Sequence, residues 1–121
     1  MKQKKEVKEI TLKLKYIKSK TDKEKGIYQG GVELPAYLDE ISFDITDDYD
    51  FNTETEEFIK NGMFAVEIQG TKRALKEMGK FLINMAMYKT EDVNYHEHID
   101  SVKNSEGNPA VNIIVRTFAA N

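Results

Sequence analysis

The sequence predicts an α+β fold: an antiparallel sheet of about four to six strands with one long helix packed on one face. Three observations lead to this prediction. Apolar and polar residues alternate over several short segments, as they do in half-buried strands. One segment, about residues 72–88, repeats its apolar residues at helical spacing instead. Turn-forming residues cluster between these segments.

Size and composition indicate a single domain over residues 1–121. The chain has 121 residues, of which 40% are apolar and 32% charged, enough for one modest core. Cysteine is absent, which excludes disulfides, thiolate zinc sites and a cysteine nucleophile and fits a reducing compartment. No apolar run approaches the roughly 20 residues of a membrane helix, and no signal-peptide core follows the lysine-rich start. We therefore expect a cytoplasmic protein without a membrane partner.

The first third of the chain contains one clear strand pattern. Residues 10–16 alternate strictly and predict a half-buried strand with lysines on its outer face. Its apolar face comprises Ile10, Leu12, Leu14 and Tyr16. A polar turn is expected over residues 19–26. Residues 30–35 begin with two glycines and contain a proline, which favours a bend or a short edge strand.

The middle of the chain predicts two strands with a short helix between them. Alternation over residues 39–46 indicates a strand, and residues 47–52 then read as an acidic loop. Thr53 and Glu56 have the spacing of a capping box, which predicts a short helix ending near Gly62. Residues 63–68 alternate again and predict the next strand.

The longest predicted element is the helix over about residues 72–88, with Thr71 as its N-cap. Its buried stripe is expected to comprise Leu75, Met78, Leu82, Met85 and Ala86. Residues 95–102 and 111–118 then read as strands. The linker of residues 103–109 is rich in turn formers, so these two strands are expected to form a hairpin.

Charge is strongly segregated along the chain. Residues 1–25 hold ten lysines against four acidic residues, a net of +6, whereas residues 33–59 hold ten acidic residues and no Lys or Arg, a net of −10. The two segments could pair internally, or they could steer a charged partner. The candidate partner-binding acidic residues are Asp44, Asp47, Asp48, Asp50, Glu54, Glu56 and Glu57. The lysine-rich segment lacks arginines and interleaved aromatics, so a nucleic-acid partner is not expected.

The most distinctive stretch runs from Tyr95 to Asp100 and holds both histidines, His96 and His98. On a strand the two residues share a face with their Cα atoms about 7 Å apart, and their imidazoles could chelate one transition metal. Asp100 would lie roughly 13 Å of strand from His96, too far for a three-ligand site without a bulge. No nucleophile motif accompanies the histidines, and no cofactor is implied. The alternative is a polar binding surface formed by Tyr95, His96, His98 and Asp100.

The order of features over residues 66–115 resembles a known family. It consists of Val66-Glu-Ile-Gln-Gly, the helix, the Tyr95–Asp100 stretch and then Asn112-Ile-Ile-Val. This order resembles the immunity protein 32 family of bacterial polymorphic toxin systems. The resemblance implies a small cytoplasmic α+β protein that neutralises a cognate toxin by occlusion, with Tyr95, His96, His98 and Asp100 at the motif positions.

Three hypotheses follow. The first is a non-enzymatic binding protein of the immunity type, whose partner is a cognate toxin or another basic protein. The second is a metal-binding protein or metal-dependent enzyme centred on His96 and His98. The third is a structural homo-oligomer, such as a homodimer, formed by pairing of exposed strand edges.

Overall fold

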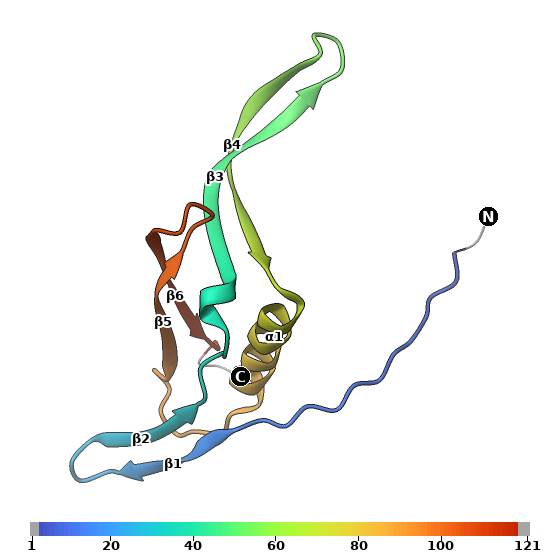
Figure 1. Cartoon of the computed structure of the whole chain (residues 1–121). Coiled ribbons are helices and arrows are strands. Elements are labelled where there is room, and N and C mark those ends of the chain that lie inside the picture. The colour runs from blue at the N-terminus through green and yellow to red at the C-terminus, as the bar shows by residue number, and fades with distance from the viewer. Residues whose placement is uncertain (1–2, 119–121) are drawn as a thin grey trace.

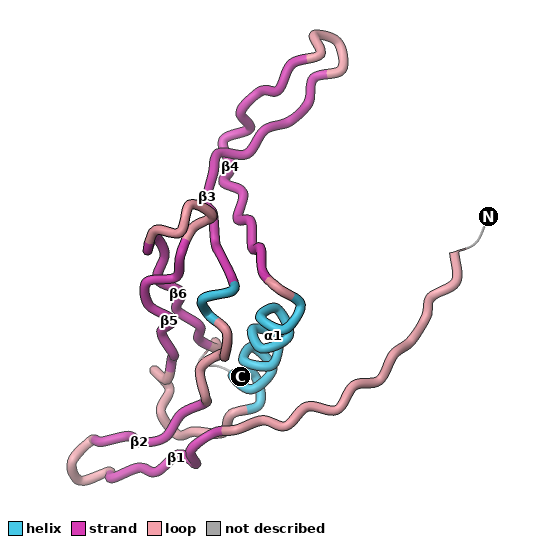
Figure 2. Tube along the Cα trace, viewed as in Figure 1, coloured by secondary structure: helices cyan, strands magenta, loops and turns pink. Residues whose placement is uncertain are grey.

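The computed structural model describes residues 3–118, which form six strands and one α-helix (Figure 1). The elements in order are β1 (Tyr16–Asp22), β2 (Ile27–Val32), the 3-10 turn η1 (Leu38–Glu40), β3 (Ile41–Asn52), β4 (Glu57–Gly70), α1 (Lys72–Met87), β5 (His96–Lys103) and β6 (Pro109–Arg116). The α+β class and the antiparallel pairing are confirmed. The predicted single sheet is wrong, because the strands form three separate hairpins: β1–β2, β3–β4 and β5–β6 (Figure 2).

The hairpins are held together by side chains rather than by a shared hydrogen-bond ladder. One buried cluster draws apolar residues from β2, β3, α1 and β5. Its members are Val32, Ile41, Phe43, Ala74, Met78, Phe81, Met85, Ile99 and Val102. Alternate residues of β6 pack against this cluster from one side. The core therefore lies where α1 meets the base of the β3–β4 hairpin and the β5–β6 hairpin (Figure 1).

The predicted helix is confirmed, with a different buried face. Thr71 caps it by accepting a hydrogen bond from the Ala74 amide at 3.2 Å. Met78 and Met85 are buried as expected, but Phe81 lies at the centre of the buried face and is only 2% exposed. Leu82 is 48% exposed. The helix has apolar residues on two faces, so spacing alone could not distinguish the covered face from the free one.

The predicted strand over residues 10–16 is wrong. Residues 3–15 form no regular secondary structure, and the chain enters a strand only at Tyr16 (Figure 2). β1 occupies part of the expected polar turn, because its partner β2 begins at Ile27 and leaves only residues 23–26 for the turn. β2 itself matches the short edge strand expected near the two glycines. Alternation marks a segment able to form a strand, but a strand also needs a neighbour to bond with.

The predicted acidic loop and short helix are also wrong, because residues 47–61 belong to one long hairpin, the β3–β4 arm (Ile41–Gly70). At its turn the Asn52 side chain accepts hydrogen bonds from the Glu54 and Thr55 amides, which replaces the expected helix cap. Phe51 and Phe58 pair across the strands with ring centroids 5.1 Å apart. Figure 1 shows the arm extending well beyond the core.

The C-terminal hairpin is confirmed. β5 and β6 pair from His96 opposite Arg116 to Lys103 opposite Pro109. A bulge interrupts the pairing after Ile99, where Ser101 has a φ of 57°. The bulge lets both Ile99 and Val102 point into the core, although they are an odd number of positions, three, apart in the sequence.

Neighbouring substitutions on α1 test the observed core. Phe81→Ala should lower the free energy of unfolding by about 3–5 kcal/mol, because it empties the centre of the core. Leu82→Ala should lower it by no more than about 0.5 kcal/mol, because the side chain faces solvent. Urea denaturation followed by circular dichroism measures both. A larger loss for Leu82→Ala than for Phe81→Ala would show that the helix packs through the other face.

Candidate functional site

Tyr95 joins the start of the last hairpin to β2. Its hydroxyl oxygen accepts a hydrogen bond from the Val32 amide at 2.9 Å, and its hydroxyl donates to the Glu97 carboxylate at 3.1 Å. Gly31 lies against this contact, since a Cβ there would sit 3.3 Å from the Tyr95 hydroxyl. The phenol satisfies a backbone amide that would otherwise be unpaired at a buried residue. Tyr95 therefore has a structural role, whatever else its exposed part contacts.

Three tyrosine rings stack beside this contact. The Tyr88 ring lies 4.8 Å from that of Tyr95 and 5.8 Å from that of Tyr16, measured between centroids. The Tyr88 hydroxyl donates to the Ile17 carbonyl at 2.7 Å. Burial raises the pKa of both Tyr88 and Tyr95 above the ordinary value for a phenol, and the carboxylate of Glu97 acts in the same direction.

His96 and His98 lie on one face of β5, as the strand spacing predicted. Their rings meet edge to face with centroids 4.7 Å apart. His96 Nδ1 lies 2.7 Å from the carbonyl oxygen of Asn94 and donates to it, which leaves Nε2 directed elsewhere. His98 Nδ1 lies 4.0 Å from an Asp100 carboxylate oxygen. The structure thus brings His96, His98 and Asp100 into one row on the surface of β5.

This row does not form a recognisable metal centre. Within residues 3–118, no group of three or more His, Cys, Asp or Glu side chains is arranged to hold a metal ion. His98 and Asp100 are exposed, so water competes for any ligand placed there. The geometry suits recognition of a polar or charged surface, with the imidazoles donating or accepting hydrogen bonds and the carboxylate accepting them.

The acidic candidates lie along the β3–β4 arm rather than in a loop. Asp44 accepts two hydrogen bonds from Ser105, at 3.2 Å from the amide and 3.0 Å from the hydroxyl, which ties the base of the arm to the β5–β6 turn. Farther out, Asp47 forms an ion pair with Lys60 at 3.0 Å. The acidic residues at the turn, Glu54, Glu56 and Glu57, are all exposed.

The two central aspartates of the arm share one amide group. The Asn61 side chain donates to Asp48 at 2.8 Å and to Asp50 at 3.2 Å. This amide bridge holds the carboxylates beside each other and leaves their charge intact. Internal pairing with the lysine-rich segment does not occur in the described chain, since Lys60 is the only lysine ion-paired with the arm among residues 3–118.

The base of the arm borders an open groove between the ends of β3 and β4 and the β5–β6 turn. Glu40 and Arg73 form a paired contact at one side of it, and the Thr71 hydroxyl also donates to Glu40 at 2.8 Å. The hydrogen bonds from Arg73 and Thr71 lower the pKa of Glu40. Lys103 and Ser105 line the opposite side.

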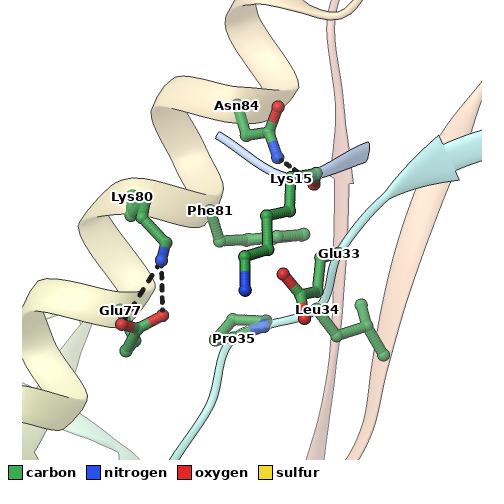
Figure 3. Close-up of a pocket in the computed structure, with 8 residues that line it drawn as sticks. All are labelled: Lys15, Glu33, Leu34, Pro35, Glu77, Lys80, Phe81 and Asn84. Atoms are coloured by element: carbon green, nitrogen blue, oxygen red, sulfur yellow. Dashed lines mark hydrogen bonds and ion pairs between the residues drawn. The ribbon is translucent and has the colours of Figure 1, made fainter. Parts of the chain in front are cut away.

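A second anchor, at the C-terminal half of α1, was not predicted from the sequence. Asn84 is the buried polar side chain of the described core, and its amide donates to the Lys15 carbonyl at 2.9 Å (Figure 3). The Glu33 amide donates to the same carbonyl at 3.1 Å. The hollow beside them is only large enough for about one water molecule, so it offers no ligand site. An asparagine within the apolar spacing of a helix was the signal that could have pointed to this contact.

A comparison with known protein families matches residues 65–116, from the middle of β4 through α1 and β5 to the end of β6. The matching family is immunity protein 32. The resemblance drawn from residues 66–115 is thereby confirmed. No curated protein and no solved structure matches the chain.

The region similar to immunity protein 32 includes the Tyr95–Asp100 row. It also includes Thr71 and Lys103, which lie on opposite sides of the groove. It excludes the acidic turn of the arm and the β1–β2 hairpin. The described helix, α1, is too short and too polar to cross a membrane.

Removing the Tyr95 hydroxyl tests its structural role. Tyr95→Phe should lower the free energy of unfolding by about 1–3 kcal/mol, because the Val32 amide loses its acceptor at a buried position. Tyr49→Phe is the matched control on an exposed ring and should change stability by less than about 0.5 kcal/mol. Urea unfolding of both variants measures the difference. A loss no larger than the control's would contradict the role of the phenol.

The raised tyrosine pKa values predict a loss of stability at high pH. Above about pH 10 the unfolded chain ionises its phenols, whereas folded Tyr88 and Tyr95 retain their protons. Their contribution is thus fully present below about pH 10 and is lost as the pH rises beyond it. Urea unfolding between about pH 9 and 11 should show a steeper decline for the wild type than for Tyr95→Phe. Parallel declines would contradict this assignment.

Proposed function

We propose that this protein is a non-enzymatic, cytoplasmic immunity protein that binds and neutralises a cognate toxin by occlusion. The observation that carries the proposal is the match of residues 65–116 to immunity protein 32. The absence of cysteine from the sequence supports the cytoplasmic location.

The β3–β4 arm supports a basic partner. Residues 41–70 carry eight acidic side chains and one lysine, a net charge of −7. All of these carboxylates belong to the β3–β4 arm. The arm extends beyond the core, so a partner can reach both faces of its outer part (Figure 1). Charge of one sign on an extended element steers a partner of opposite sign and accelerates association.

The row on β5 supports a second contact. His96 and His98 on β5, together with Asp100 at its bulge, present imidazole and carboxylate groups within the region similar to immunity protein 32. We assign this row, with the exposed part of Tyr95, to specific recognition of the toxin. The acidic residues Asp44, Asp47, Asp48, Asp50, Glu54, Glu56 and Glu57 are assigned to attraction of its basic surface.

The test of function is protection in cells. Co-expression of this chain with a candidate toxin from its gene neighbourhood should restore growth that the toxin alone prevents. Purified chain should also form a stable complex with a catalytically inactive form of that toxin. Growth arrest in the presence of well-expressed chain, together with no complex in solution, would overturn the proposal.

The role of the arm is tested by neutralising two of its exposed carboxylates. Glu54→Gln combined with Glu57→Gln should slow association with the toxin by about threefold to tenfold at low salt and change dissociation less. The control combines Glu24→Gln with Glu91→Gln, which removes the same charge from the opposite end of the molecule. Stopped-flow binding measures both. Equal effects of the two pairs would indicate that only net charge matters.

A further inference from the structure

The N-terminal segment, residues 3–15, has the pattern of a strand but no strand partner among the residues that the structure describes, 3–118. It lies extended, and its outer part is exposed, with Val7 89% and Ile10 67% accessible to solvent. Toward the core the exposure falls, to 36% at Leu12 and to a half-buried Leu14. Its alternation places Ile10, Leu12 and Leu14 on one side and Thr11, Lys13 and Lys15 on the other. A segment of this kind exposes apolar side chains and unpaired backbone groups to water, and both gain by adding to a sheet.

β4 offers the corresponding edge. In the described chain β4 pairs only with β3, so its other edge has no strand neighbour. The face of the arm that carries Phe43 into the core continues along β4 as exposed apolar side chains, with Phe64 72%, Val66 59% and Ile68 49% exposed. On the other face Asp44 stands opposite Glu67. The arm, like the N-terminal segment, therefore has one apolar face and one charged face.

The charges and lengths of the two elements are complementary. Residues 3–15 carry five lysines and two glutamates, a net of +3, against the net of −7 on residues 41–70. A strand added with Ile10, Leu12 and Leu14 on the apolar face directs Lys5, Lys13 and Lys15 toward the opposite face of the arm. That face holds Asp44 and Glu67. β4 has 14 residues, which matches the length of the segment.

The geometry favours a second copy over the segment's own arm. Hydrogen bonds from Asn84 and from the Glu33 amide fix the carbonyl of Lys15 beside the C-terminal half of α1. From this point the segment runs outward, while β4 ends at the opposite end of the helix (Figure 1). The helix thus separates the root of the segment from the free edge of its own β4.

We propose that residues 3–15 of one copy add as a third strand to the free edge of β4 in a second copy, and that the exchange is reciprocal. The added strand covers backbone groups of β4 and widens the apolar face. The two copies are then joined by two strand pairings, each between the segment of one copy and β4 of the other. The arm keeps a net charge of −4 after pairing, from −7 and +3, so a basic toxin is still attracted. The dimer does not depend on the proposed immunity function.

The oligomeric state tests this exchange directly. Light scattering coupled to size-exclusion chromatography should give twice the mass of one chain for the wild type. Ile10→Pro should give the mass of one chain, because proline lacks the amide donor and is excluded from a paired strand. Ile10→Val keeps the strand propensity and should remain dimeric. A monomeric wild type, or a dimeric Ile10→Pro protein with an unchanged circular dichroism spectrum, would overturn the proposal.

Cross-linking identifies where the segment binds. A photo-cross-linking amino acid in place of Ile10, in an equal mixture of isotope-labelled and unlabelled chains, should give links to β4 that join a labelled chain to an unlabelled one. Mass spectrometry of the digested products distinguishes the two kinds of pair. Links confined to the same chain, or links to elements other than β4, would overturn the exchange.

Discussion

The packing of one face of α1 against side chains from separate hairpins is the interaction on which this structure depends. Phe81 and Ile99 are its most deeply buried large side chains, and Val32 and Phe43 complete the contact from the other two hairpins. Because no hydrogen-bond ladder links the hairpins to one another within residues 3–118, the gain from burying these apolar groups must hold the three in place. A few specific polar contacts, such as the hydrogen bond from the Val32 amide to Tyr95, then fix how the hairpins are placed relative to one another.

A core of this kind leaves much of the chain available for partners. The outer part of the β3–β4 arm extends beyond the core and exposes one apolar and one acidic face. The second apolar face of α1, which includes Leu82, is also uncovered. Small proteins that act by binding rather than by catalysis can use such surfaces directly, because recognition requires shape, charge and apolar contact but no reaction centre.

The sequence predicted those elements whose pattern and turn chemistry agree. α1 and the β5–β6 hairpin were predicted because Thr71 caps the helix and the linker of residues 103–109 forms turns. The predicted strand over residues 10–16 was wrong, because alternation cannot supply a neighbouring strand. The predicted helix after Thr53 was wrong because the Asn52 side chain accepts a hydrogen bond from the Glu54 amide and so stabilises a hairpin turn in place of a helix cap. The face shared by His96 and His98 followed from strand periodicity. The hydrogen bond of Tyr95 to Val32 joins residues far apart in the chain, and local pattern carries no information about it.

Hydrogen–deuterium exchange of the chain with and without a cognate toxin tests the central claim most directly. The account predicts that toxin slows exchange in two places, the acidic turn of the β3–β4 arm and the start of β5 at residues 95–100, while the amides of α1 remain as they were. Protection confined to α1 or to the β1–β2 hairpin would contradict the account, because it would place the toxin on surfaces that carry neither the acidic residues nor the histidine row.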